Sequence, residues 1–297
     1  MSWVVYLFGS GTAFFLGIGL LLISLAAFCC CQRPVPKIIC SISSVVGCLF
    51  IVVSATPLPY WLYFVAATAT ILWLVAERSA HRWISARRTS LRVVAAIIWS
   101  VMAALELPFQ FTPTISAANR PTLYIIGDSV AAGMSDSGKG TWPRLLASSH
   151  SAPVVDLSKM GATASLAMQQ ADGVPPAGGM VLLEIGGNDL LGTTSASKFE
   201  KDLGRLLGRV CCPGRVVLMF ELPLPPFCNE FGRVQRRLAA EYGVRLIPKR
   251  IFMKVLTGSG NTLDSIHLSA QGHEKMADEV WKIIRPAYRH EIGNPTP

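Results

Sequence analysis

Four long apolar runs occupy the first third of the chain, and a different pattern of apolar and polar positions fills the rest. These runs cover residues 4–31, 38–55, 61–76 and 91–107. A helix that crosses a bilayer needs about 20 apolar residues, within a range of about 17–25. The first run is comfortably long, the second is adequate, and the last two are near the minimum. The pattern therefore predicts a four-helix transmembrane anchor over residues 1–107.

A polar linker with prolines at both ends follows, over residues 108–121, and after it short apolar strands alternate with amphipathic helices. We expect strands at 123–126, 154–157, 180–185, 216–221 and 244–247. We expect helices at 141–149, 164–171, 197–210, 229–242 and 269–285. Single helices between short apolar strands are typical of a parallel sheet covered on both faces. The sequence thus predicts one α/β domain over residues 122–290 and a tail over residues 291–297.

Composition agrees with this division of the chain. The mean hydropathy of +0.44 is too high for an ordinary soluble enzyme and indicates membrane segments. The net charge of +9 is split between the two parts, with +5 up to Glu106 and +4 beyond it. The basic excess therefore does not indicate nucleic-acid binding. No Cys/His spacing suggests a metal site, and we predict no cofactor.

The basic residues of the first part lie in two of its loops. Arg33 and Lys37 lie in the loop after the first run, and four arginines lie in the loop after the third: Arg78, Arg82, Arg87 and Arg88. By the positive-inside rule, both loops are cytoplasmic and the second half of the chain is extracytoplasmic. The first run lacks the basic start and the cleavage site of a signal peptide. No run has a charge at mid-membrane, so we interpret the helices as an anchor.

Four short segments contain candidate chemistry. They are Gly127-Asp128-Ser129, the single Gly161, the GGND sequence of residues 186–189, and the segment from Asp264 to His267. The first three each follow a predicted strand. Ligand sites in such sheets form at the carboxyl ends of the strands, so we expect these segments to converge.

A nucleophilic serine needs a base, a group that orients the base, and donors for the oxyanion. Ser129 offers the hydroxyl, and His267 is the best candidate base. Asp264, three residues earlier, can reach the Nδ1 atom of that histidine. The amide of Asn188 and the backbone N–H groups of Ser129 and Gly161 can form an oxyanion hole. Each segment alone is more often a turn or a cap, but all four in this order indicate a serine hydrolase.

The four segments resemble the signature blocks of the SGNH, or GDSL-type, hydrolases, over residues 122–287. The sequences VLLEIGGNDLL and DSIHLSAQGH look most like the small bacterial lysophospholipase and thioesterase-type enzymes. The resemblance implies a flavodoxin-like, three-layer α/β/α sandwich with five parallel strands. It also implies the roles given above for Ser129, Gly161, Asn188, Asp264 and His267. The small relatives are secreted soluble proteins, so the N-terminal helices depart from the family pattern.

We therefore expect a membrane-anchored serine esterase that hydrolyses carboxylic esters outside the cytoplasm through an acyl-enzyme. Anchoring favours a lipid, a lysophospholipid or an O-acetylated glycan as the ester, with membrane lipid as the partner of the four helices. Two alternatives stay open. The same residues could transfer an acyl group to an envelope acceptor, or the domain could be a non-catalytic membrane protein that binds a glycan.

Overall fold

The computed structural model describes residues 3–30, 34–79, 81–115, 121–134 and 140–288. The chain divides into two compact units, which we describe separately. One is helical and contains residues 7–110 with 225–229; the other contains residues 1–6, 111–224 and 230–297 and is the α/β unit. Arg33, residues 116–120 of the predicted linker and the predicted tail lie outside the described residues.

The α/β unit is built on a five-stranded parallel sheet, as the sequence predicts. Its strands are β1 (Leu123–Gly127), β2 (Val154–Asp156), β3 (Met180–Glu184), β4 (Val216–Phe220) and β5 (Arg245–Ile247). The strand order is β2-β1-β3-β4-β5, and every neighbouring pair is parallel. In the register between β1 and β3, Gly127 pairs with Glu184. The chain therefore leaves β1 beside the last residue of β3.

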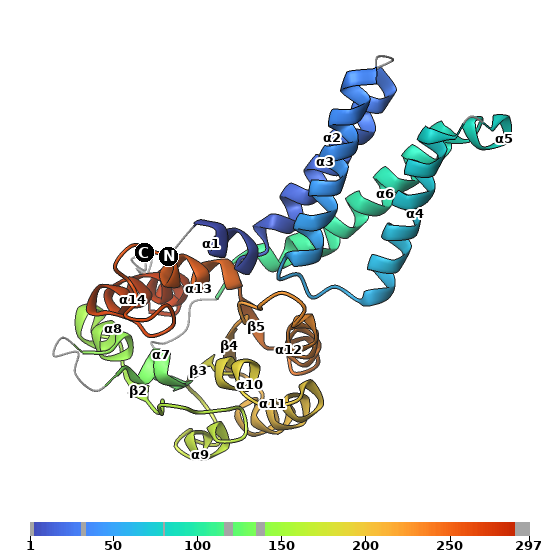
Figure 1. Cartoon of the computed structure of the whole chain (residues 1–297). Coiled ribbons are helices and arrows are strands. Elements are labelled where there is room, and N and C mark those ends of the chain that lie inside the picture. The colour runs from blue at the N-terminus through green and yellow to red at the C-terminus, as the bar shows by residue number, and fades with distance from the viewer. Residues whose placement is uncertain (1–2, 31–33, 80, 116–120, 135–139, 289–297) are drawn as a thin grey trace, which may run out of the picture. The chain divides into compact units, whose positions relative to one another are not determined.

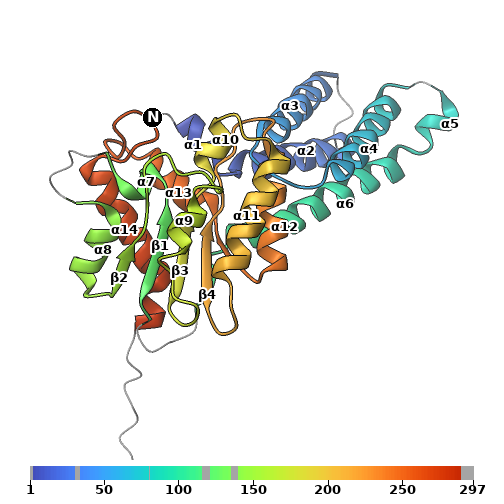
Figure 2. The ribbon, with the colours of Figure 1, turned by 90° about the horizontal axis from the view of Figure 1, so that it is seen from below.

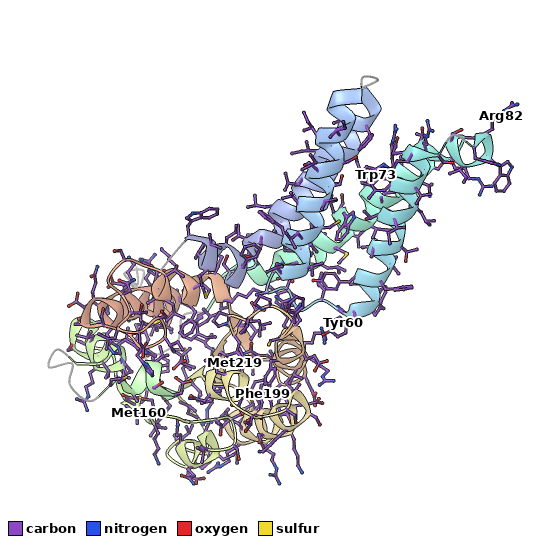
Figure 3. All side chains as sticks on the ribbon, viewed as in Figure 1. Tyr60, Trp73, Arg82, Met160, Phe199 and Met219 are labelled. Atoms are coloured by element: carbon purple, nitrogen blue, oxygen red, sulfur yellow. The ribbon has the colours of Figure 1, made fainter. Side chains whose placement is uncertain are left out.

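Helices cover both faces of this sheet (Figures 1 and 2). One face carries α8 (Trp142–His150), α13 (Lys249–Leu256) and α14 (Ala270–Ile284), and the other carries α9 (Ala167–Ala171), α11 (Ala196–Val210) and α12 (Asn229–Glu241). Alternate strand residues point to opposite faces. Leu123 and Ile125 accordingly pack with Trp142, whereas Met219 and Phe199, labelled in Figure 3, are fully buried on the other side of the sheet.

Three helices of the α/β unit lie at positions where the sequence pattern predicts none. Two of them are very short: α7 (Ser129–Ala132) and α10 (Gly187–Leu191). A segment of four or five residues is too short to show a helical period. The third is α13, where Phe252 and Val255 are buried as the spacing of an amphipathic helix requires. It begins directly after Pro248, which cannot continue a strand interior.

Helix α1 (Trp3–Gly9) is divided between the two units after residue 6. The helical unit also contains α2 (Thr12–Cys30), α3 (Pro34–Val53), α4 (Tyr60–Arg78), α5 (Arg82–Ser85) and α6 (Arg88–Glu106), which the 3-10 helix η1 (Leu107–Gln110) extends. Among the described residues, two helices are long and apolar enough to cross a membrane, Tyr60–Arg78 and Arg88–Gln110. A third does so if α1 and the described part of α2 count as one span. The four predicted spans therefore stay a prediction.

The first apolar run is not one continuous helix, contrary to expectation. It bends by 82° between α1 and α2. Gly11 has a φ of 82°, and the Ser10 hydroxyl accepts a hydrogen bond from the Thr12 N–H at 3.3 Å. A left-handed glycine ends one helix and a serine cap begins the next, which a hydropathy pattern does not reveal.

The four long helices of this unit, α2, α3, α4 and α6, pack closely. A Cβ atom on Gly17 of α2 would lie 2.6 Å from the Gly47 carbonyl of α3, so the glycines allow close backbone contact there. One apolar cluster joins the end of α2 to the start of α3 and the end of α4 to the start of α6, through Phe28, Cys40, Trp73 and Ala95. The end of α2 and the start of α3 consequently lie at the same end of the unit as the end of α4 and the start of α6 (Figure 1).

Candidate active site

Ser129 is the first residue of α7, directly after the end of β1. Asp128 caps this helix, because its Oδ1 atom accepts a hydrogen bond from the Val130 N–H at 3.0 Å. A Cβ atom on Gly127 would lie 2.7 Å from the Cβ of Ala131. Only glycine at this position lets the helix turn back over the end of the strand. The sharp turn leaves Ser129 at the sheet edge, and the residue is 7% exposed.

The backbone N–H groups of the residues next to Ser129 already donate hydrogen bonds, but in the described part of the chain the N–H of Ser129 itself does not. The Asp128 N–H donates to the Glu184 carbonyl at 3.2 Å, and the Ala131 N–H donates to the Glu184 carboxyl group. Among the described residues, no acceptor is present for the Ser129 N–H. This amide is therefore available to an external oxygen.

Gly161 lies in the loop that follows β2. Its φ of 72° is in the left-handed region, and no atom lies within 4 Å of the position its Cβ would take. The Lys159 N–H donates to the Gly127 carbonyl at 3.1 Å, which holds the loop against the end of β1. In the described part of the chain the Gly161 N–H also has no acceptor. Glycine here supplies the unusual backbone angle, and the space beside its Cα is open.

Asn188 lies in α10, after the end of β3. Its Nδ2 atom lies 3.0 Å from the Ala162 carbonyl and 3.4 Å from Oδ2 of Asp128. The next residue, Asp189, accepts a hydrogen bond from the Ala164 N–H at 2.8 Å. These contacts tie α10 both to the Gly161 loop and to the residue before Ser129. The three predicted oxyanion donors are therefore joined at one edge of the sheet.

Asp264 and His267 form a closely bonded pair in the loop between α13 and α14. The Oδ2 atom of Asp264 lies 2.6 Å from Nδ1 of His267, and Oδ1 accepts the backbone N–H groups of His267 at 2.9 Å and Ile266 at 3.1 Å. The backbone bond from His267, followed by its ring and the Ile266 bond, lowers the pKa of Asp264 to about 2. Asp264 therefore stays ionised and holds the Nδ1 proton, which leaves Nε2 as the basic nitrogen.

The base of this loop is firmly held. The Leu263 N–H donates to the His267 carbonyl at 2.8 Å, and the Asn261 side chain donates to the Val255 carbonyl at 2.8 Å. A Cβ atom on Gly272 would lie only 2.0 Å from the Asn261 carbonyl. The loop therefore packs directly on the first turn of α14, which Ser269 caps as predicted.

His267 also acts on the group beside the serine. Its charge lowers the pKa of Asp128, which places the ring within electrostatic reach of the residue before Ser129. No hydrogen bond joins Ser129 Oγ to His267 among the described contacts. Catalytic hydrogen bonds in unliganded enzymes are often long and shorten only when substrate binds.

The structure adds a feature that the sequence did not assign, a contact between Asp128 and Glu184. Both residues are buried and their carboxyl groups are hydrogen-bonded to one another. Burial raises the pKa of Asp128 to about 6. Burial, and then the Asp128 charge, raise the pKa of Glu184 well above its usual value. From the sequence, a glutamate in an apolar strand can be expected to need a hydrogen-bond partner, but the sequence does not identify that partner.

His273, the other histidine near these segments, is structural in its contacts. It is fully buried in α14, and its Nδ1 atom accepts a hydrogen bond from the Trp142 N–H at 3.2 Å. Within the described residues, no group of three or more His, Cys, Asp or Glu side chains could hold a metal ion.

A comparison with known families decides the class. The model of the GDSL-like lipase/acylhydrolase family matches residues 125–275, half of the chain, and this stretch contains every residue of the site. The chain belongs to this family. As a GDSL-type acylhydrolase it is a carboxylic ester hydrolase, and its parallel sheet is the one that the resemblance implies.

Curated relatives of this GDSL-type protein include bacterial thioesterases and esterases. An Escherichia coli protein named as a thioesterase, protease and lysophospholipase is 29% identical over 199 residues, which is 63% of this chain and 95% of the relative. The esterase TesA of Pseudomonas aeruginosa is 27% identical over 180 residues, 56% of this chain and 88% of the relative. Both matches leave much of the chain unmatched.

Solved structures similar to this GDSL-type chain include a crystal structure of TesA and one of the esterase EstA from a Pseudoalteromonas species. The first is 25% identical, with a TM-score of 0.49, and covers 56% of this chain and 99% of that one. The second is 21% identical, with the same TM-score, and covers 56% and 97%.

Proposed function

We propose that this protein is a membrane-anchored serine esterase whose hydrolase domain lies on the extracytoplasmic side. The contact between Asp264 and His267, at 2.6 Å, is the observation that best supports the catalytic part. An ionised carboxylate on Nδ1 leaves Nε2 as the basic nitrogen, and Ser129 at the start of α7 is the proposed nucleophile. This is the arrangement that a serine nucleophile requires.

In the proposed reaction, Ser129 Oγ bonds to the carbonyl carbon of the ester while His267 Nε2 takes its proton. The carbonyl oxygen becomes an oxyanion, which the N–H groups of Ser129 and Gly161 and the side chain of Asn188 stabilise. The C–O bond of the leaving alcohol then breaks, and His267 returns the proton to that alcohol. Water attacks the acyl-enzyme by the same route and regenerates the serine. Each such oxyanion donor is worth about 10²- to 10³-fold in rate.

The two free N–H groups support the proposed oxyanion hole. Backbone amides that already donate to protein acceptors cannot serve a developing negative charge without breaking a bond. Those of Ser129 and Gly161 have no acceptor among the described residues, whereas the neighbouring amides of Asp128, Val130 and Ala131 do. The Asn188 amide makes one hydrogen bond of ordinary length, 3.0 Å to the Ala162 carbonyl, and one long contact, 3.4 Å to Asp128. The long contact is the one that an oxyanion would replace.

The helical unit supports the membrane part of the proposal. Helix α4 and residues 88–110 have the apolar length that a membrane span needs. In addition, the end of α2 and the start of α3 pack in one cluster with the end of α4 and the start of α6. The Arg78 guanidinium at the end of α4 donates to the Ser41 hydroxyl near the start of α3, at 3.2 Å. The arginines that follow α4 consequently lie at the end of the unit where α3 begins, and the positive-inside rule favours a cytoplasmic side for that end.

Reporter fusions test the orientation. We expect a full-length chain with alkaline phosphatase at its C-terminus to be active in an extracytoplasmic compartment, and the matching green fluorescent protein fusion to be dark. A fluorescent fusion with inactive phosphatase would contradict the orientation.

The substrate we propose is an acyl ester of the membrane or envelope, with a lysophospholipid favoured by the name of the Escherichia coli relative. The test compares lysophospholipids, acetylated sugars and acyl thioesters as substrates of the purified full chain in detergent, with a Ser129→Ala chain as the blank. We expect Ser129-dependent release of free acid. No hydrolysis of any ester by a folded protein would favour a non-catalytic binding protein.

Acyl transfer to an envelope acceptor is the alternative reaction at the same residues. It differs only in the second step, where an alcohol in place of water attacks the acyl-enzyme. Adding a sugar or glycerol acceptor to the assay separates the two. We expect free acid to remain the main product; a product that is mostly the new ester would overturn hydrolysis as the function.

A further inference from the structure

Two buried carboxyl groups, those of Asp128 and Glu184, lie against the helix that begins with Ser129. Asp128 is 3% exposed and Glu184 is 5% exposed. The sheet brings them together, because Gly127 pairs with Glu184 and Asp128 follows at once. A Cβ atom on Gly127 would lie 3.3 Å from Oε2 of Glu184, so the glycine also makes room for this carboxyl group.

The pair contacts two parts of the proposed site, the turn that holds Ser129 and the side chain of Asn188. Glu184 accepts the Asp128 N–H at 3.4 Å and the Ala131 N–H, and Asp128 accepts the Val130 N–H at 3.0 Å. These bonds fix the turn on which Ser129 lies. Asp128 also faces the Asn188 amide at 3.4 Å. A change in this pair would therefore move the nucleophile and an oxyanion donor together.

A hydrogen bond between two carboxyl groups needs one proton, because an ionised carboxylate only accepts. Two carboxylates in contact and out of water do not both ionise at neutral pH. The hydrogen bond from Glu184 of β3 lowers the pKa of Asp128. The charge of His267, in the loop before α14, also lowers this pKa, and the charge of Asp189 in α10 raises it. On Glu184 the charge that acts is that of Asp128. The proton of the pair therefore belongs on Glu184, because burial and the neighbouring Asp128 charge raise its pKa well above the usual value.

We propose that Glu184 is a positioning residue of the esterase site. Its protonated carboxyl group donates a hydrogen bond to Asp128 and limits the pair to one negative charge next to the turn on which Ser129 lies. The inference rests on the proposed esterase function. Negative charge develops on the carbonyl oxygen near Ser129, Gly161 and Asn188 during the reaction. A second anion directly behind these donors would oppose that charge. Because the Asp128 carboxylate already accepts a hydrogen bond from Glu184, it competes less with the oxyanion for the hydrogen bond of the Asn188 amide.

Glu184→Gln tests the proton donation, because the amide can donate to Asp128 and accept from α7 but has no proton to lose. Near neutral pH we expect its kcat to lie within about tenfold of wild type. Glu184→Leu, of similar volume, can neither donate nor accept, and we expect its kcat to fall by about 10- to 100-fold. KM should change less than kcat, because the pair acts on the nucleophile and on an oxyanion donor.

The pH profile separates this role from a merely structural one. For the full chain in detergent, with p-nitrophenyl butyrate as substrate, we expect the kcat of wild type to fall at high pH as Glu184 ionises. That alkaline fall should be absent from Glu184→Gln over about pH 5 to about pH 10. The same alkaline fall in both proteins would overturn the inference. If Glu184→Leu does not fold, the comparison of wild type with Glu184→Gln is sufficient.

Infrared spectroscopy gives a readout that does not depend on activity. We expect wild type at neutral pH to show the carbonyl band of a buried protonated carboxyl group, and Glu184→Gln to lack it. Active wild type without this band would overturn the inference and leave the proposed function intact. Wild type that shows the band but hydrolyses no ester would instead overturn the proposed function, and the catalytic role of Glu184 with it.

Discussion

The carboxylate of Asp264 holds His267 at two points. Its Oδ2 atom lies 2.6 Å from the ring Nδ1, and its Oδ1 atom accepts the backbone N–H of the same residue at 2.9 Å. The ring therefore cannot turn without breaking a bond to a group that also holds the backbone. Ser265, between them, has a φ of 88°, a costly backbone angle for a residue other than glycine. The loop keeps this conformation because both ends of the pair are bonded.

The first prediction concerns Asp264. Asp264→Asn removes the charge that stabilises the His267 cation and allows the wrong tautomer, so we expect kcat to fall by about 10³- to 10⁴-fold. The side chain is 52% exposed, so the thermal midpoint should barely change. Steady-state hydrolysis by the full chain in detergent measures the first effect, and a thermal melt the second.

Asp172→Asn is the matched control. Asp172 is also an exposed aspartate with a basic partner, Arg209 at 3.8 Å, but it follows α9 and lies outside the proposed site. We expect it to have the activity of wild type. Equal kcat values for the two variants would show that Asp264 does not orient the base.

The second prediction compares two glycines. Gly161 and Gly214 have φ values of 72° and 79°, and neither has an atom within 4 Å of its Cβ position. An alanine at either position should therefore cost the same backbone strain, about 1–2 kcal/mol. Gly161→Ala should also lower kcat by roughly 10- to 100-fold, because a displaced amide loses its alignment with the oxyanion.

Gly214 precedes the amino end of β4, whereas Ser129 follows the carboxyl end of β1. In a parallel sheet these ends lie on opposite sides. Gly214→Ala should accordingly lose stability without losing kcat. Unfolding by urea and steady-state kinetics on both variants give the comparison. An equal loss of kcat in the two would mean that Gly161 acts only through stability.

The strands and the site segments could be predicted from the sequence because their determinants are local. Short apolar runs bounded by Gly, Pro and Asp gave all five strands, and the GGND segment before Leu190 placed Asn188 after one of them. The predicted linker also contains residues that contact the α/β unit. Ile115 is buried in the core of the α/β unit, and the Thr114 carbonyl accepts a hydrogen bond from Arg245 at 2.7 Å.

What could not be predicted depends on contacts between distant residues. Asp128 and Glu184 are far apart in sequence and meet only because β1 and β3 are neighbours in the register seen here. A pattern of apolar positions does not say which strands are adjacent. The helix break at Ser10 and Gly11 was not predicted for a different reason. A hydropathy pattern tolerates both residues in a membrane helix, whereas here a capping serine and a left-handed glycine end the helix.

The third prediction is a dependence of stability on pH. In the folded state Asp128 has a pKa of about 6, against 3.8 for the ordinary group. Below pH 3.8 the group is protonated in both states. As pH rises toward about 6, the folded protein retains a proton that the unfolded chain has released, so the free energy of unfolding falls, by about 3 kcal/mol. Glu184 extends this loss to higher pH.

The double variant Asp128→Asn/Glu184→Gln supplies the reference, because neither amide titrates. We expect the free energy of unfolding of wild type, minus that of the variant, to fall between about pH 4 and about pH 7. Urea unfolding of the full chain in detergent at several pH values measures this difference. A difference that stays constant with pH would show that the two carboxyl groups are not buried as a pair.

The nucleophile is the centre of the proposed mechanism, and a fluorophosphonate probe tests it most directly. The probe forms a covalent bond only with a serine that an adjacent base activates. Purified full-length wild type, Ser129→Ala and Ser197→Ala are treated alike, and the modified peptide is found by mass spectrometry. Ser197 is an exposed serine at the start of α11 and serves as control. We expect one probe per molecule on Ser129 in wild type and Ser197→Ala, and none in Ser129→Ala; equal labelling of all three proteins would contradict the mechanism.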